Sequence, residues 1–166
     1  IQLYICIYNY CMNMNVEERI KTTASLPPER RTIIHLMLVN NLIQDVLVQA
    51  LKPFDVSIQQ FNVLRILRGQ KGEPANLSTL NERMVSRMSN TTRLVDKLIL
   101  KGYTERNTCP ENRRKVEIRM TERGTTALSA MDLAVEQAEK ELMSAMDPKD
   151  LIVLNKLLDQ ITFKYE

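Results

Sequence analysis

The histidines and glycines of this chain limit the catalytic and metal chemistry that it can perform. His35 is the only histidine, which excludes zinc sites that need two or more histidines. A Ser-His-Asp triad would depend on His35, and no G-x-S-x-G motif accompanies it. The four glycines cannot form G-x-G-x-x-G or G-x-x-x-x-G-K-S/T, the loops that hold nucleotide phosphates. We therefore expect no enzymatic activity, no metal and no cofactor.

A run of short polar and basic residues suits contact with DNA instead. Asn90, Arg93 and Lys97 are spaced three and four residues apart, which places them on one face of a helix. Asparagine can pair with adenine, and arginine with guanine or a phosphate. Two adjacent arginines further along suit the narrow, electronegative minor groove. The expected DNA contacts are Ser89, Asn90, Thr92, Arg93 and Lys97 from the helix, with Arg113 and Arg114 from a turn.

The formal net charge of +3 averages regions of opposite sign. Residues 75–124 hold 11 Lys and Arg against 6 Asp and Glu, a net charge of +5. Residues 125–166 hold 4 against 8, a net charge of −4. The expected DNA contacts therefore lie in a basic region, as attraction to phosphates requires.

The pattern around these residues predicts two short helices followed by a β-hairpin. The helices are expected over 78–85 and 90–101, with Ser89 as the N-cap of the second helix. The strands are expected over 103–109 and 115–120, where polar and apolar residues alternate or strand formers gather. A helix-turn-helix followed by a hairpin with a basic tip is a winged helix.

Long segments with helical patterning flank this unit. Residues 29–52 carry an apolar stripe that covers more than one face, and a capped helix begins after Ser57. Residues 121–165 are predicted to form two helices separated at Asp147-Pro148. A stripe this wide suits a helix that packs both on its own core and on a second subunit. The fold class is therefore mostly α with a small β-hairpin (α+β): a winged helix-turn-helix with N- and C-terminal dimerisation helices.

Two segments resemble the MarR family of winged-helix transcriptional regulators. Residues 89–98, followed by Gly102, resemble the S-x-x-T-R-L-V-D-x-L…G recognition segment of that family. Residues 112–124 resemble its wing signature, D-x-R-x-x-x-V-x-L-T-x-x-G. Asn112 stands where the family usually has Asp, which bears on the rigidity of the wing, and Ile118 and Met120 are conservative departures. The resemblance covers about 29–165.

The resemblance implies a homodimer that binds double-stranded DNA sequence-specifically and regulates transcription, as a repressor. Two recognition helices about 34 Å apart would read a pseudo-palindromic operator. The alternative is a winged helix that binds protein and has lost DNA binding. That alternative predicts a recognition face and a wing without cations, which Arg93, Lys97 and Arg114 argue against.

The resemblance also suggests that a small amphipathic or phenolic effector, or an oxidant, controls DNA binding. The candidate pocket residues are His35, Met37, Phe61 and Met131, and the alternative is that they are ordinary core residues. Cys109 lies in the wing, where oxidation could weaken DNA binding. Three irregularly spaced cysteines form no disulfide framework, which favours reduced thiols in the cytoplasm.

The expected domain organisation has three parts within a single structural domain. Residues 1–28 form an N-terminal extension with little order, of which 1–13 lie upstream of the native start. The apolar run at the N-terminus is too short to span a membrane and has no basic residues before it, so we expect no membrane partner. Residues 29–52 and 121–165 supply the dimerisation helices, and 57–120 form the DNA-binding lobe.

Overall fold

The computed structural model describes residues 15–85, 90–108 and 116–161. The chain falls into two units, 1–45 and 46–166. The boundary lies inside the long helix α3 (Pro28–Leu51), whereas the sequence pattern predicts a single domain. Most side chains in the first half of α3 are exposed, so that half makes few contacts beyond its own helical turns.

The first unit contains one helical turn before α3. Helix α2 (Val16–Arg19) begins with a capping box, in which the side chain of Asn15 accepts from the backbone N–H of Glu18 and the side chain of Glu18 accepts from the backbone N–H of Asn15. Arg31 donates a 2.8 Å hydrogen bond to the Glu17 carboxylate, and this bond lowers the pKa of Glu17. This helical turn lies within the first 28 residues, the segment for which the sequence pattern predicts little order.

Helix α3 is unusually apolar on its exposed side. The segment Pro28–Phe54 is long and apolar enough to cross a membrane by length and composition, a test that core helices of soluble proteins also meet. The large apolar side chains of α3 that remain exposed are Ile33, Leu36, Met37, Val39 and Val48. A short 3-10 helix, η1 (Lys52–Phe54), follows α3 and leads into the core of the second unit.

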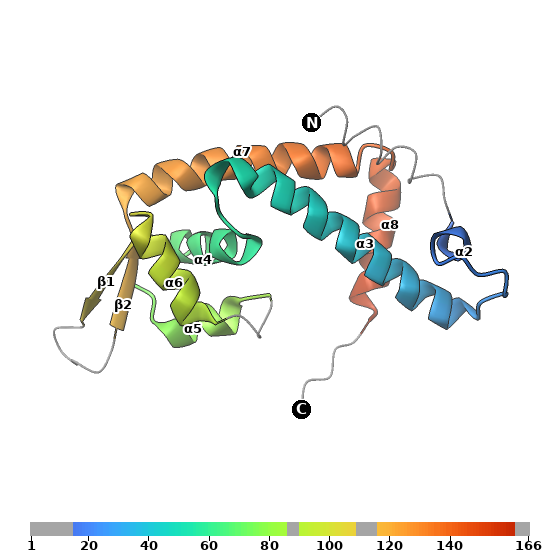
Figure 1. Cartoon of the computed structure of the whole chain (residues 1–166), viewed down its shortest axis with the longest axis horizontal. Coiled ribbons are helices and arrows are strands. Elements are labelled where there is room, and N and C mark those ends of the chain that lie inside the picture. The colour runs from blue at the N-terminus through green and yellow to red at the C-terminus, as the bar shows by residue number, and fades with distance from the viewer. Residues whose placement is uncertain (1–14, 86–89, 109–115, 162–166) are drawn as a thin grey trace. The chain divides into compact units, whose positions relative to one another are not determined.

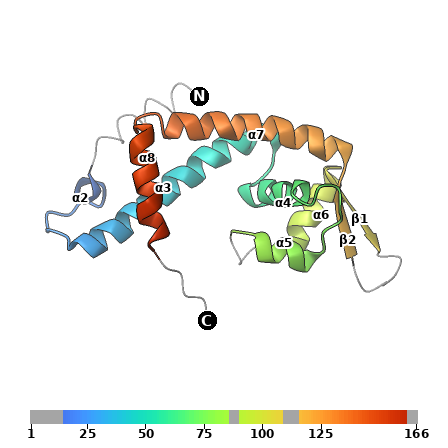
Figure 2. The same ribbon diagram turned by 180° about the vertical axis from the view of Figure 1, so that it is seen from behind.

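The second unit is built around helix α4 (Ile58–Arg68), which lies against three other helices and a strand (Figure 1). The remaining elements are α5 (Leu77–Arg83), α6 (Thr91–Leu100), β1 (Thr104–Thr108), β2 (Val116–Met120), α7 (Glu122–Leu142) and α8 (Pro148–Asp159). Helices α5, α6 and α7 and strand β2 all contact α4. The reverse view shows α7 running from the hairpin past α4, with α8 after its far end (Figure 2).

The core of this unit gathers side chains from every element that surrounds α4. Val63 and Leu64 of α4 are fully buried, and they belong to a core cluster with residues that precede α4 in the sequence and residues that follow it. The other fully buried large side chains are Leu51, Leu80, Val95, Leu98, Ile118, Leu128 and Met131. Burial of such side chains, at about 1.5–3 kcal/mol each, holds the helices in one arrangement.

The hairpin is antiparallel and gains an additional bridge. Thr104 lies opposite Met120, and Thr108 lies opposite Val116. Ala75 exchanges backbone hydrogen bonds of 3.0 and 2.8 Å with Ile118, on the free edge of β2. The sequence pattern predicts no strand pairing before α5, and this bridge ties the segment before that helix to the hairpin.

The helix caps follow local sequence chemistry, with one correction. Ser57 forms the expected capping box with Gln60, and Thr121 accepts a 3.0 Å hydrogen bond from the backbone N–H of Gly124. Helix α5 begins one residue before the expected 78–85, because Asn76 caps it, and it ends at Arg83, since the backbone of Met84 is extended. Asn90, not Ser89, is the N-cap of α6. Both residue types are common N-caps, so sequence alone does not choose between neighbours.

Candidate nucleic-acid interface

Helix α6 presents one buried face and one exposed polar face. Thr91, Val95 and Leu98 are buried against the rest of the second unit, and Leu94 is partly buried beside them. The exposed side chains of this segment are Asn90, Thr92, Arg93, Asp96, Lys97 and Leu100. The exposed face therefore carries four of the five expected helix contacts, with one large apolar residue beside them.

Asn90 holds the first turn of α6 through its side chain. Its Oδ1 accepts a 3.2 Å hydrogen bond from the backbone N–H of Arg93. Bidentate pairing with adenine uses the carboxamide oxygen as an acceptor and the NH2 as a donor. The oxygen keeps a second lone pair, so any base contact of Asn90 has to share that atom with the cap.

Side-chain contacts fix α6 relative to the preceding helix. The Thr91 hydroxyl donates to the side-chain oxygen of Asn81 on α5. Met84 and Leu80 lie in the same buried cluster as Val95 and Leu98, so apolar packing supports this contact. A helix whose exposed face enters a groove of DNA is fixed to its own protein only through its buried face. Contacts of this kind therefore set its position.

A second set of contacts joins α6 to the hairpin. Arg106 of β1 pairs with Asp96 of α6, with 2.8 Å between Nη2 and Oδ1. The helix ends in a Schellman motif: Tyr103 N–H donates to Leu98 C=O at 3.0 Å, and Gly102 adopts a φ of +71°.

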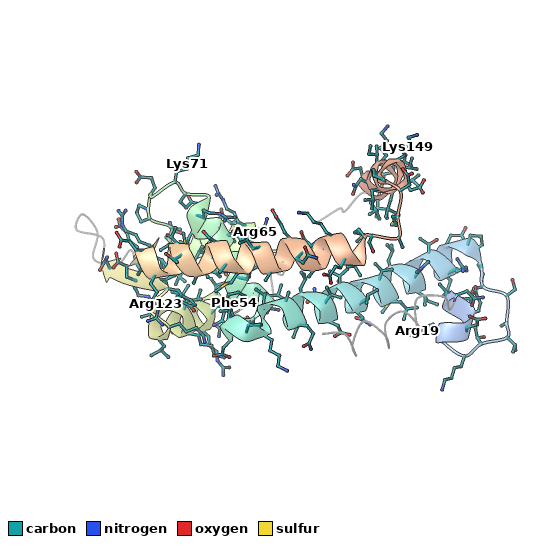
Figure 3. The ribbon with its side chains drawn as sticks, turned by 90° about the horizontal axis from the view of Figure 1, so that it is seen from above. Arg19, Phe54, Arg65, Lys71, Arg123 and Lys149 are labelled. Carbon is teal, nitrogen blue, oxygen red and sulfur yellow. The ribbon has the colours of Figure 1, made fainter. Side chains whose placement is uncertain are left out.

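The start of α7 completes this junction. Thr121 Oγ1 donates a 2.7 Å hydrogen bond to the carbonyl of Gly102. A Cβ on Gly124 would overlap the carbonyl oxygen of Tyr103, so only glycine allows this approach of α7 to the end of α6. The guanidinium of Arg123 lies 5.7 Å from the centre of the Tyr103 ring and can be located in Figure 3. Helix α6 and the hairpin are therefore joined through one compact corner.

Comparisons with known proteins agree with this geometry. The model of the MarR family matches residues 56–116, which span α4 to the first residue of β2. Over these residues the chain resembles the MarR family. Apo wild-type MarR of E. coli is 25% identical, with a TM-score of 0.66 over 84% of this chain and 100% of that one. A MarR transcription factor of Planctomyces limnophilus is 27% identical, with a TM-score of 0.64 over 82% and 97% of the two chains.

A match to a curated relative is shorter. The uncharacterised HTH-type transcriptional regulator YfiV of Bacillus subtilis (strain 168) is 35% identical over 68 residues, 41% of this chain and 41% of that protein. The matched region thus spans less than half of this relative. The MarR family consists of transcription regulators rather than enzymes, and its winged-helix fold confirms the expected mostly helical architecture with a small hairpin.

Several expected MarR site residues lie outside the part of the chain that the structure describes. Ser89, Arg113, Arg114 and Cys109 are among them, as is Asn112. Strands β1 and β2 end at Thr108 and begin at Val116, so the two wing arginines lie in the segment that connects the strands. Their DNA contacts remain predictions.

The candidate effector-pocket residues are distributed between the core and the surface. Phe61 and Met131 are buried in the hydrophobic core of the second unit, and the Arg65 guanidinium lies 5.6 Å from the Phe61 ring centre. His35 and Met37 are exposed side chains of the first unit. The burial of Phe61 and Met131 matches ordinary core packing, the alternative that the sequence left open.

Basic residues contribute in ways that sequence reasoning missed. Arg119 of β2 donates a 2.8 Å hydrogen bond to the carbonyl of Gly72, which joins the hairpin to the turn after α4. Lys71 projects from that turn (Figure 3) and adopts a φ of +55°. Arg106 is the other missed residue, through its pair with Asp96. These partners are distant in sequence, so no local spacing signals them.

Proposed function

We propose that this protein is a sequence-specific, double-stranded-DNA-binding transcription regulator that acts as a homodimeric repressor in the cytoplasm. The observation that carries the proposal is the exposed polar face of α6, supported from behind by α4 and α5 and joined to the hairpin by Arg106 and Asp96. A face of this composition has donors for base edges and cations for phosphates.

The dimensions of the helix suit the major groove. Ten residues at about 1.5 Å each give a helix about 15 Å long, which fits a groove about 12 Å wide. In the proposed complex, Arg93 contacts guanine or a phosphate, Lys97 contacts the backbone, and Asn90 and Thr92 lie near base edges or methyl groups. Arg113 and Arg114 would extend from the hairpin to the adjacent minor groove.

The charge distribution supports this orientation. The region 75–124 has a net charge of +5, whereas 125–166 has a net charge of −4. Attraction to DNA therefore acts on the winged helix, and repulsion keeps the acidic region away from phosphates. A structural neighbour, a mutant MarR of E. coli complexed with operator DNA, is 24% identical and has a TM-score of 0.72 over 84% and 100% of the two chains. At that identity the likeness is one of fold, and the operator is that protein's own.

Exposed apolar side chains on and just after α8 support the homodimer. Ile152, Val153, Leu157 and Ile161 are each more than two-fifths exposed in the single chain. A 12-residue helix with so little burial is marginal without a partner. In the proposed dimer these side chains and the apolar face of α3 are buried between subunits, and two α6 helices read half-sites about one DNA turn apart.

Control by a small ligand is a further part of the proposal. One structural neighbour is the organohalide-sensing RdhR-CbdbA1625 in its 2,4-dichlorophenol-bound form, and another is Bordetella bronchiseptica BpsR, whose DNA binding is regulated by 6-hydroxynicotinic acid. These neighbours are 18% and 17% identical, so the likeness is one of fold. The two ligands are those of the neighbouring proteins and identify no ligand of this chain. Oxidation of Cys109 is the other route of control that the sequence suggests.

Selection of binding sites from a random duplex library tests the proposal. The full chain is incubated with the library, and retained duplexes are sequenced over several rounds. We expect enrichment of an inverted repeat with half-sites about 10 base pairs apart. Retention without sequence enrichment would reduce the function to nonspecific DNA binding, and no retention at low salt would favour the protein-interaction alternative.

A further inference from the structure

Two neighbouring residues at the C-terminal end of α6 contact different parts of the chain. Lys101 is the C-cap of α6, and its ammonium donates a hydrogen bond to the carboxylate of Asp55, the residue after η1. Gly102 comes next, and its carbonyl accepts the 2.7 Å hydrogen bond from Thr121 at the start of α7. This end of α6 is therefore joined both to the segment after α3 and to α7.

Asp55 lies in a segment that is anchored on both sides. It ends η1, with a φ of +52°, and its backbone N–H donates a 3.0 Å hydrogen bond to the carbonyl of Lys52. Leu51, before η1, and Val56, after Asp55, are both buried in the core of the second unit. The Asp55 carboxylate is therefore presented to Lys101 from a fixed backbone. Phe54, the last residue of η1, can be located in Figure 3.

The ion pair itself lies at the surface. The Asp55 side chain is 94% exposed, whereas that of Lys101 is 25% exposed, so the aliphatic stem of the lysine is largely covered. The hydrogen bond from Lys101 lowers the pKa of Asp55, and the nearby charge of Lys97 lowers it further. Exposed ion pairs contribute little to the stability of a fold. The loss of this pair should therefore leave the protein folded.

The two contacts join α6 to the helices of the proposed dimer interface. The segment with Asp55 follows α3 directly, and α7 leads into α8. Both α3 and α8 carry exposed apolar side chains that are buried between subunits in the proposed dimer. The packing of α6 on α4, α5 and β1, in contrast, lies within the winged helix. The C-terminal end of α6 is thus a point at which subunit association can set the direction of the helix.

We propose that Lys101 and Asp55 are positioning residues: their ion pair limits the pivoting of α6 and so determines which half-site separations the dimer accepts. A dimer reads two half-sites at once, so its tolerance for separation depends on the freedom of each recognition helix. A pivot of about 10° would move the far end of a helix about 15 Å long by about 2.6 Å, most of the roughly 3.4 Å between base pairs. The inference rests on the proposed homodimeric DNA binding.

Two substitutions break the ion pair with little other disturbance. Asp55→Asn is isosteric, and asparagine tolerates the left-handed backbone of this position. Lys101→Met keeps an unbranched stem and removes the ammonium. Glu136→Gln is the matched control, because it removes the carboxylate of another exposed ion pair, with Lys140, inside the single helix α7.

The measurement is the affinity of the full chain for duplexes that carry the selected half-sites at the selected separation, or one base pair nearer or farther apart. The ratio of affinities for selected and altered separations is compared among variants. A uniform change in attraction to phosphates, such as the loss of a carboxylate causes, cancels in this ratio. We expect each variant to lower the ratio about two- to fivefold, the range for one exposed ion pair, with unchanged base preference within a half-site.

The double variant should lower the ratio no further than either single variant, because both substitutions remove the same pair. Glu136→Gln should keep the wild-type ratio. A ratio that stays at the wild-type value in both single variants, falls additively in the double variant, or falls equally in Glu136→Gln would overturn the proposal and leave DNA binding intact. Lost base preference within a half-site would overturn it too, because the pair would then support the structure of α6 itself.

The wild-type protein alone distinguishes a failure of the proposed function. If it binds no duplex, or binds all separations equally, the reading of two half-sites by a dimer is wrong and the positioning role falls with it. If it prefers one separation and the variants share that preference undiminished, only the positioning role is wrong.

Discussion

Asn90 has two possible roles that compete for the same atom. Its Oδ1 caps α6 by accepting from the N–H of Arg93, and the same carboxamide is the expected adenine contact. Serine at this position would preserve the cap, because Ser and Asn are similarly favoured N-caps, but it would remove the carboxamide. Alanine would remove both. The two substitutions therefore separate helix stability from base recognition.

We expect Asn90→Ala to lower the free energy of unfolding by about 1 kcal/mol, the usual loss for an N-cap, and Asn90→Ser to leave it nearly unchanged. Both variants should lose preference at one base pair of the selected site, by about 1–3 kcal/mol. Urea denaturation and gel shifts with single-base operator variants measure the two effects. If Asn90→Ser keeps full base preference, Asn90 acts as a cap alone.

The recognition helix and the wing should differ in how their loss affects DNA binding. Arg93→Ala removes an exposed cation that we propose contacts a base edge, so we expect relaxed preference at its base pair by about 1–3 kcal/mol. Arg114→Ala should weaken binding to all sequences alike and reduce the slope of log affinity against log salt by about one. Gel shifts across salt concentrations and operator variants measure both, and equal effects would refute this division of roles.

The corner between α6, the hairpin and α7 fixes the position of α6 relative to the two strands. Thr121 contacts the Gly102 carbonyl and caps α7 at once, and Gly124 allows the backbone of Tyr103 to approach. Since both strands leave this corner, its geometry sets the direction of the wing relative to α6. Helix propensity alone would favour alanine over glycine by about 1 kcal/mol, so the sign of a substitution is informative.

We expect Gly124→Ala to destabilise the protein by about 1–3 kcal/mol, because the added Cβ meets a backbone oxygen that cannot move without shifting the hairpin. Ser129→Ala, at an exposed position of the same helix, is the control and should stay within about 0.5 kcal/mol of wild type. Chemical denaturation provides the measurement. A neutral or stabilising Gly124→Ala would show that the corner adjusts freely.

The elements themselves were largely predictable from the sequence. Capping residues, the positions of the prolines and the two hydrophobic periods placed both ends of α6 and of the two strands, and the starts of α4, α7 and α8, within about one residue of their observed positions, whereas α7 and α8 end several residues earlier than the pattern suggests. These signals are local, and each is set by backbone chemistry at one place in the chain. The choice between Ser89 and Asn90 as the cap failed because neighbouring residues of equal propensity are separated only by the packing of the helix.

The contacts that complete the site were not predictable in the same way. The bridge from Ala75 to Ile118 involves only one residue on each side. It therefore leaves no alternation of polar and apolar residues in the sequence that would predict it. The ion pair between Lys101 and Asp55 joins two separate segments, which only the tertiary fold brings together. Apolar residues such as Phe61 look alike in sequence whether they fill a core or line a pocket, and the structure places Phe61 in the core.

At the scale of the whole molecule, exposed apolar surface and charge lie in different regions. Positive charge is concentrated in 75–124, whereas a run of exposed apolar side chains belongs to α8, in the acidic region after 125. Monomeric proteins rarely expose contiguous apolar patches of this kind. This separation suits a molecule in which one region associates with a second copy and the other binds a polyanion.

Leu157 offers the most direct test of that association. Its side chain is 56% exposed in the single chain, so Leu157→Glu should not disturb the core of the second unit. We expect it to weaken dimerisation at least about thirtyfold, corresponding to roughly 2 kcal/mol for a central interface residue, as measured by light scattering over a concentration series. DNA affinity should fall in parallel, because a monomer contacts one half-site. Asn155→Glu adds the same charge about 160° around α8 from Leu157, on the side of Ile152, so a smaller effect than that of Leu157→Glu would centre the subunit contact on the Leu157 side. A dimer that persists unchanged in Leu157→Glu would place the subunit contact away from this face.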